Sequence, residues 1–152
     1  MEYDIESRPS YALLSVDLDA GEAIRAEAGA MVSYDDGIDI QTDASGGILG
    51  SLKRSVLGGE SFFQNTFTAA EPGEVTLAPA LSGDVVHHDL DGTLMVQSGS
   101  YLASDPSIEL DTEFGGGRTF FGGEGLFLLK LDGTGPVFLS SYGAIREREL
   151  AA

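Results

Sequence analysis

Short apolar stretches recur along this chain, and turn residues separate them. Gly37–Thr42 sets Ile38 and Ile40 between polar neighbours, and such alternation is the period of a half-buried strand. Glycine, proline and Asp–Gly turns bound most stretches at the spacing of hairpins. The pattern predicts these strands: Tyr11–Leu18, Glu22–Tyr34 with a bend at Gly29, Gly37–Thr42 after an Asp35–Gly37 hairpin turn, Glu60–Ala69, Glu74–Ala78, Val85–Leu90, Thr93–Gln97, Tyr101–Ala103, Ile108–Thr112, Leu126–Leu131, Val137–Tyr142 and Ile145–Leu150.

One stretch fits two interpretations. Ile48, Leu49, Leu52 and Val56 have roughly helical spacing, whereas the glycines around them are equally typical of a mobile flap. No convincing long helical pattern occurs elsewhere. Many short strands without long helices indicate an all-β sandwich or barrel.

A ten-residue motif occurs twice and gives the chain its organisation. It reads R-S-V-L-G-G-E-S-F-F at 54–63 and R-T-F-F-G-G-E-G-L-F at 118–127. A glycine pair before a strand usually allows close backbone approach, and the glutamate could pair with the arginine. Duplication favours this structural role over a binding role. The matching residues are Arg54 and Arg118, Gly58 and Gly122, Gly59 and Gly123, Glu60 and Glu124, and Phe63 and Phe127.

The repeat extends beyond the motif. Gly29–Gly47 aligns without a gap onto Gly99–Gly117, seventy residues later. Fixed-offset similarity is the signature of repeated supersecondary units. We therefore expect a first β unit at residues 1–82 and a second at 83–142. Residues 143–152 resemble the opening of the second unit and predict the first strand of an incomplete third.

Acidic residues dominate the charge. The formal net charge is −17, with 25 acidic residues against 8 basic ones. Such a surface repels phosphate, which disfavours nucleic acid and anionic membranes as partners. An acidic patch for cations or a basic partner is one explanation. A solvated surface adapted to high salt, where screening reduces self-repulsion, is the explanation we favour.

Other features narrow the location. The chain has no cysteine, so it has neither disulfides nor thiolate sites. The acidic start M-E-Y-D-I-E lacks the layout of a signal peptide. No apolar run approaches the ~20 residues of a membrane helix. The sequence predicts a cytoplasmic protein without integral membrane association.

Candidate chemistry is sparse. His87-His88-Asp89 suggests a metal site, but adjacent strand residues point to opposite faces, so the two histidines could hardly share an ion. Gly115–Gly117 and Gly133–Gly135 complete no phosphate-binding motif. No nucleophile elbow occurs. We therefore expect no catalytic residues, no metal and no cofactor.

Several motifs in fixed order resemble a known family. They are Y-A-L-L-S-V-D-L-D-A-G-E, E-A-G-A-M-V-S-Y, L-G-G-E-S-F-F, V-Q-S-G-S-Y-L-A-S, F-F-G-G-E-G-L-F and V-F-L-S-S-Y-G-A-I. Together they resemble the altered-inheritance-of-mitochondria family over nearly the whole chain. The resemblance implies a fold like the tryptophan RNA-binding attenuation protein (TRAP-like), a short double-stranded β-helix in tandem units. It also implies a trimer or ring and no enzymatic activity.

These observations lead to two hypotheses. The first is a non-catalytic homo-oligomeric β protein that acts as a scaffold or binding module. The second is a protein that binds a small ligand or cation in a glycine-lined groove between units. An unidentified enzyme ranks third, and RNA binding rests on fold analogy alone.

Overall fold

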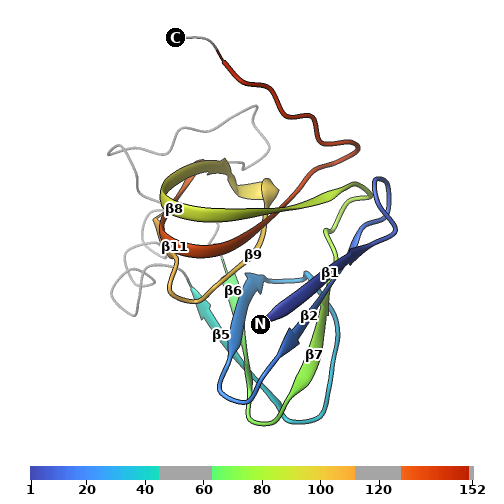
Figure 1. Ribbon diagram of the computed structural model, residues 1–152, viewed down its shortest axis with the longest axis vertical. Coiled ribbons are helices and arrows are strands. Elements are labelled where there is room, and N and C mark those ends of the chain that lie inside the picture. The colour runs from blue at the N-terminus through green and yellow to red at the C-terminus, as the bar shows by residue number, and fades with distance from the viewer. Residues whose placement is uncertain (45–62, 112–127, 151–152) are drawn as a thin grey trace.

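The computed structural model describes residues 1–44, 63–111 and 128–150, and almost all regular structure there is β-strand (Figure 1). The all-β prediction is confirmed. One 3₁₀ turn, η1 (Ser98–Ser100), interrupts the strands. The strands are β1 (Glu2–Glu6), β2 (Leu13–Leu18), β3 (Ala23–Glu27), β4 (Met31–Tyr34), β5 (Ile38–Ala44), β6 (Phe63–Ala69), β7 (Gly73–Leu77), β8 (Val85–Gln97), β9 (Tyr101–Ser104), β10 (Glu109–Asp111) and β11 (Leu128–Ser140).

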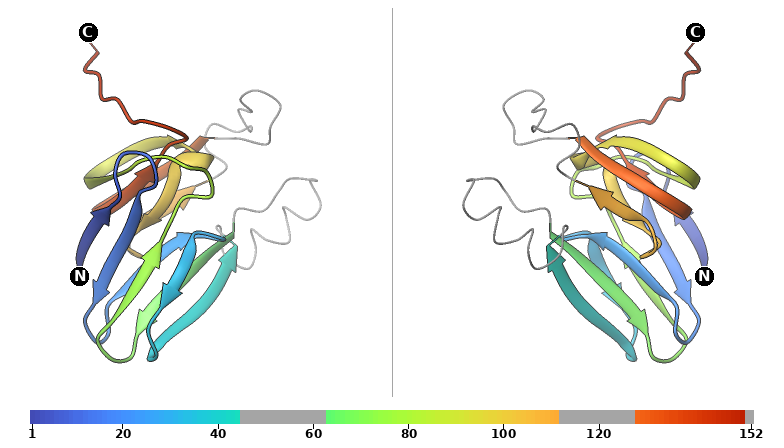
Figure 2. Two further views of the ribbon diagram at one scale, coloured as in Figure 1. Left: turned by 90° about the vertical axis from the view of Figure 1, so that its right-hand side faces the viewer. Right: turned by 90° about the vertical axis from the view of Figure 1, so that its left-hand side faces the viewer.

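Two curled sheets contain these strands (Figure 2). The smaller runs β1-β2-β7-β4, and the larger runs β10-β11-β9-β3-β6-β5 with β8 also paired to β11. The Asp35–Gly37 turn joins β4 to β5, which lie in different sheets. The predicted hairpin at this turn is therefore wrong: the turn carries the chain between sheets, and Gly37 supplies its left-handed conformation with φ of 91°.

Alternation along the strands forms the core. Leu14, Val16 and Leu18 of β2 are buried, whereas their neighbours are more exposed. One buried cluster joins both sheets at β2, β3, β6 and β7 and includes Val85 and Phe138. A second cluster fills the β8–β11 region: Leu90, Val96, Tyr101, Ile108, Leu129, Leu131 and Val137. Burial of these side chains is the main stabilising contribution.

The two longest strands merge segments that the sequence predicts as separate. β8 pairs with β11 without interruption from Val85 opposite Ser140 to Gln97 opposite Leu128. The positive φ angles of Gly92, Gly133 and Gly135 fall where we expected turns. Glycine allows the backbone to bend there without a Cβ clash. These glycines therefore lie within continuing strands rather than between strands.

Both ends of the chain differ from prediction. β1 was not expected, because three of its five residues are acidic. Its backbone nevertheless pairs fully with the edge of β2. Conversely, the predicted strand Ile145–Leu150 does not form, and the segment leads away from the sheets (Figure 1). A strand requires a neighbouring edge, and among the described residues the segment around Gly143 makes only an isolated bridge with Gly83.

Strand pairing in the two halves of the chain follows the same registers. The β4–β7 ladder corresponds to the β9–β11 ladder, and each shifts register once within it. The β3–β6 ladder corresponds to the second half of β8 with β11, and β5–β6 to β10–β11. Corresponding pairs are Ala23–Thr68 with Thr93–Asp132, Met31–Leu77 with Tyr101–Leu139, and Asp39–Thr68 with Glu109–Asp132.

Candidate functional site

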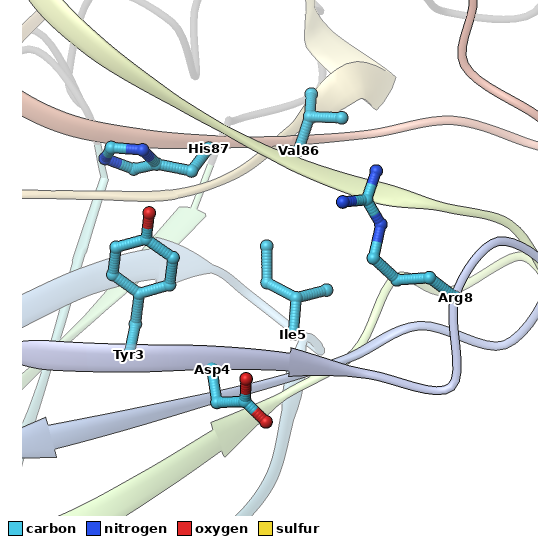
Figure 3. Close-up of a pocket in the computed structure, with 6 residues that line it drawn as sticks. All are labelled: Tyr3, Asp4, Ile5, Arg8, Val86 and His87. Carbon is cyan, nitrogen blue, oxygen red and sulfur yellow. The ribbon is translucent and has the colours of Figure 1, made fainter.

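A cleft of about 440 Å³ lies between β1 and the beginning of β8. Figure 3 shows its walls, which come from two sequence regions about eighty residues apart. The lining residues are Tyr3, Asp4, Ile5, Arg8, Val86 and His87. None is a glycine, so this cleft differs from the glycine-lined groove of our second hypothesis.

The alternation of β1 directs its side chains. Successive strand residues point to opposite faces, so Tyr3 and Ile5 point toward β8 while Asp4 points away from it (Figure 3). Antiparallel pairing with β2 fixes β1 in this orientation, with Tyr3 opposite Val16 and Ile5 opposite Leu14. β1 therefore supplies one aromatic and one aliphatic side chain, Tyr3 and Ile5, to this wall.

Two rings, Tyr3 and His87, line one end of the cleft, and a third ring, Phe138, packs against both. The ring centroids of Tyr3 and His87 are 4.6 Å apart, with the planes tilted by 32°. Phe138 lies behind both, 5.0 Å from Tyr3 in an edge-to-face contact and 5.4 Å from His87. Because Phe138 is fully buried, the three rings connect the cleft to the core and restrict each other's movement. Aromatic contacts of this kind contribute about 0.5–1.5 kcal/mol each beyond area burial.

An ion pair closes the other end. The Arg8 guanidinium donates from Nε to Asp84 Oδ1 at 2.8 Å and from Nη2 to Oδ2 at 2.9 Å. Asp84 is only 6% exposed, and its Oδ1 also accepts from the Val85 N–H at 2.9 Å. The hydrogen bond from Arg8 is the main reason that the pKa of Asp84 lies below its ordinary value. The Arg8 side chain itself is 47% exposed, so the guanidinium can reach a second anion in the cleft.

The two histidines diverge, as strand alternation predicts. His87 is half-buried in the cleft and its Nε2 lies 3.1 Å from Oδ1 of the exposed Asp89, whereas His88 is exposed on the other face. Within the described ranges, no three His, Cys, Asp or Glu side chains are grouped as metal ligands. The described histidines thus provide one ring for the cleft.

Nine of the ten duplicated-motif residues fall outside the described residues: Arg54, Gly58, Gly59, Glu60, Arg118, Gly122, Gly123, Glu124 and Phe127. The tenth, Phe63, begins β6 and is exposed; its carbonyl accepts from the Ala28 N–H at 3.1 Å. The helix-or-flap alternative at 48–56 also falls outside them. The structural role of the motif stays a prediction.

Sequence reasoning missed the residues that form the cleft wall on β1. The signal was present, because E-Y-D-I-E alternates acidic and apolar residues as a half-buried strand does. The alternation alone did not indicate which element Tyr3 and Ile5 would face. That information depends on the tertiary approach of β1 to β8.

The family model described as mitochondrial biogenesis AIM24 matches residues 3–152. The chain belongs to the AIM24 family. This confirms the resemblance stated above. Among curated proteins, an uncharacterized protein of Streptococcus pyogenes serotype M6 is 28% identical over 97% of this chain and 63% of its own.

A crystal structure gives the same fold. It is that of a Streptococcus pyogenes protein determined by a structural genomics consortium, with a TM-score of 0.73 and 27% identity. The match covers 93% of this chain and 65% of that one. This AIM24 chain thus spans just under two thirds of the length of the relatives it matches.

The described part of the chain contains no helix that is long and apolar enough to cross a membrane.

Proposed function

We propose that this AIM24-family chain acts without a catalytic step, as a scaffold that associates with further copies of itself. The proposal includes the two-unit division at residues 1–82 and 83–142. Its main support is that the strand registers of the two halves correspond, down to the register shift in the β4–β7 and β9–β11 ladders.

Local turn geometry supports the same division. The Ile38 N–H donates to the Asp35 carbonyl at 3.3 Å, and the Ile108 N–H donates to Asp105 at 3.1 Å. The Asp35 N–H also donates to the Glu74 carbonyl, and the Asp105 N–H donates to the Pro136 carbonyl, both at 3.0 Å. A unit that recurs with the same backbone hydrogen bonds is suited to assembly through repeated contacts.

Light scattering coupled to size-exclusion chromatography tests self-association. We expect a mass above the 15.9 kDa of one chain at micromolar concentration, with more assembly at high salt, because screening weakens repulsion between chains of −17 charge. A monomer at both salt concentrations would refute the scaffold proposal. The cytoplasmic location remains part of the same proposal, and fractionation of the source cells tests it.

The cleft favours a second candidate function, binding of a small ligand. The end lined by the Tyr3 and His87 rings suits a flat aromatic group, and the exposed side of Arg8 suits a carboxylate or phosphate on the same ligand. Thermal shift against a panel of aromatic carboxylates tests this candidate. A shift that His87→Ala removes and His88→Ala retains would support it; silence across the panel would set this candidate aside.

A further inference from the structure

The two halves of the chain join through strand edges. β3 pairs with β9, with Arg25 opposite Ser104 and Ala26 opposite Ala103. The larger sheet thereby continues from the first half of the chain into the second. Two side chains support this junction: Arg25 donates to the carbonyls of Pro106 at 2.8 Å and Ile108 at 3.2 Å, and the Tyr101 hydroxyl donates to the Arg25 carbonyl at 3.3 Å.

The strands that correspond to β9 and β3 in the other half of the chain have no such junction partner among the described residues. β4 corresponds to β9, yet among the described residues it pairs with β7 alone and ends its sheet. Residues 93–97 of β8 correspond to β3, and within the described ranges β8 pairs with β11 alone. An edge strand presents unpaired N–H and C=O groups that can bind another strand. The described chain therefore has one free edge that corresponds to β9, on β4, and one that corresponds to β3, at residues 93–97 of β8.

Neither edge carries the devices that usually prevent pairing. Proteins commonly protect edges with charged residues or proline. β4 reads M-V-S-Y and residues 93–97 read T-L-M-V-Q, without charge or proline, although the whole chain carries −17. All four residues of β4 are exposed, including Val32 at 56% and Tyr34 at 47%, and Met95 on the other edge is 37% exposed. Two copies of a strongly acidic chain repel each other, so they can approach most easily where their surfaces carry no charge. These two uncharged edges with exposed apolar side chains are therefore suited to contact between copies.

We propose that the outer edge of β4 in one copy pairs antiparallel with residues 93–97 of β8 in a second copy. Met95 and Val96 lie seventy residues after Arg25 and Ala26 of β3. Tyr34 and Ser33 lie seventy residues before Ser104 and Ala103 of β9. The register of the β3–β9 junction therefore sets Met95 opposite Tyr34 and Val96 opposite Ser33. The methionine thioether then faces an aromatic ring, a favourable contact. This inference rests on the proposed self-association and names the surface that carries it.

The interface is heterologous, because one copy contributes its β4 edge and the other contributes its β8 edge. Such contacts form a ring when the rotation closes and a filament when it does not. A ring pairs both edges of every copy and has one fixed mass, whereas a filament leaves one unpaired edge at each end and grows by one chain at a time.

Cysteine cross-linking tests the register directly, because the chain has no cysteine of its own. Tyr34→Cys and Met95→Cys are prepared separately, mixed and treated with copper–phenanthroline. We expect a disulfide-linked dimer in the mixture and its loss when either variant is treated alone. Ile40→Cys replaces Tyr34→Cys in the matched control, since Ile40 is also exposed on an edge strand, β5. Equal cross-linking in the control mixture, or none in the Tyr34–Met95 mixture, would overturn the register.

A second variant separates this inference from self-association itself. Val32→Lys adds charge to the β4 edge at an exposed position, so the fold tolerates it, while Ile40→Lys adds the same charge to β5. We expect Val32→Lys to convert the assembly to monomer and Ile40→Lys to leave its mass unchanged. If wild type assembles and Val32→Lys assembles equally, self-association stands and the β4–β8 interface is wrong. If wild type is a monomer, the scaffold proposal fails as well.

Discussion

Gly83 marks the point where the second half of the chain starts beside the end of β11. A Cβ on this residue would overlap the Ser141 carbonyl oxygen and lie 2.8 Å from the Ser141 carbonyl carbon and 2.9 Å from the Gly143 nitrogen. All three are backbone atoms, which cannot rotate out of the way. Gly83→Ala must therefore separate the two segments.

The hydrogen bonds between the segments give the magnitude. Gly143 N–H donates to the Ser82 carbonyl at 3.0 Å, Asp84 N–H to the Gly143 carbonyl at 3.2 Å, and Ser141 N–H to the Asp84 carbonyl at 3.2 Å. Each contributes about 0.5–1.5 kcal/mol net. Loss of three bonds predicts that Gly83→Ala lowers the free energy of unfolding by roughly 2–4 kcal/mol, a large part of the ~5–15 kcal/mol of a typical domain.

Denaturant unfolding at fixed salt measures this change, with Gly21→Ala as the control. Gly21 has φ of 89° but nothing within 4 Å of an added Cβ, so that variant adds backbone strain of about 1–2 kcal/mol without any steric overlap, whereas Gly83 lacks a positive φ and its variant adds the overlap alone. We expect Gly83→Ala to be clearly less stable than Gly21→Ala. A Gly83→Ala variant as stable as wild type would show that the two segments do not pack as described.

Three further predictions concern charge. Burial raises the pKa of Glu27 to about 7 from 4.5. Between these two pH values the folded protein keeps a proton on Glu27 that the unfolded chain has lost, so the free energy of unfolding falls as pH rises through this range. Glu27→Gln should therefore raise the melting temperature at pH 8 but not at pH 4. The pKa of Asp84 is instead lowered, chiefly by Arg8. Asp84→Asn should therefore destabilise the protein at neutral pH, and calorimetry should show the difference shrinking as pH falls through and below 3.8. Added KCl should raise the melting temperature of wild type, and a fall would refute a salt-adapted surface.

The sequence determined the fold class and most strand positions because alternation and turn residues act locally. β2, β5, β6, β7 and β9 lie within one to three residues of their predicted ends. Several motifs in order also sufficed for the family. These results depend on short-range chemistry, in which each residue's neighbours along the chain carry the signal.

Only the tertiary structure decided which edges meet. E-Y-D-I-E becomes β1 because β2 offers an edge, whereas Ile145–Leu150, which the sequence also predicted as a strand, stays unpaired among the described residues. Tyr3, Arg8 and His87 form a cleft only through the approach of β1 to β8. Strand pairing and clefts depend on residues distant in sequence, and a pattern read along one strand contains no information on the strand that it will face.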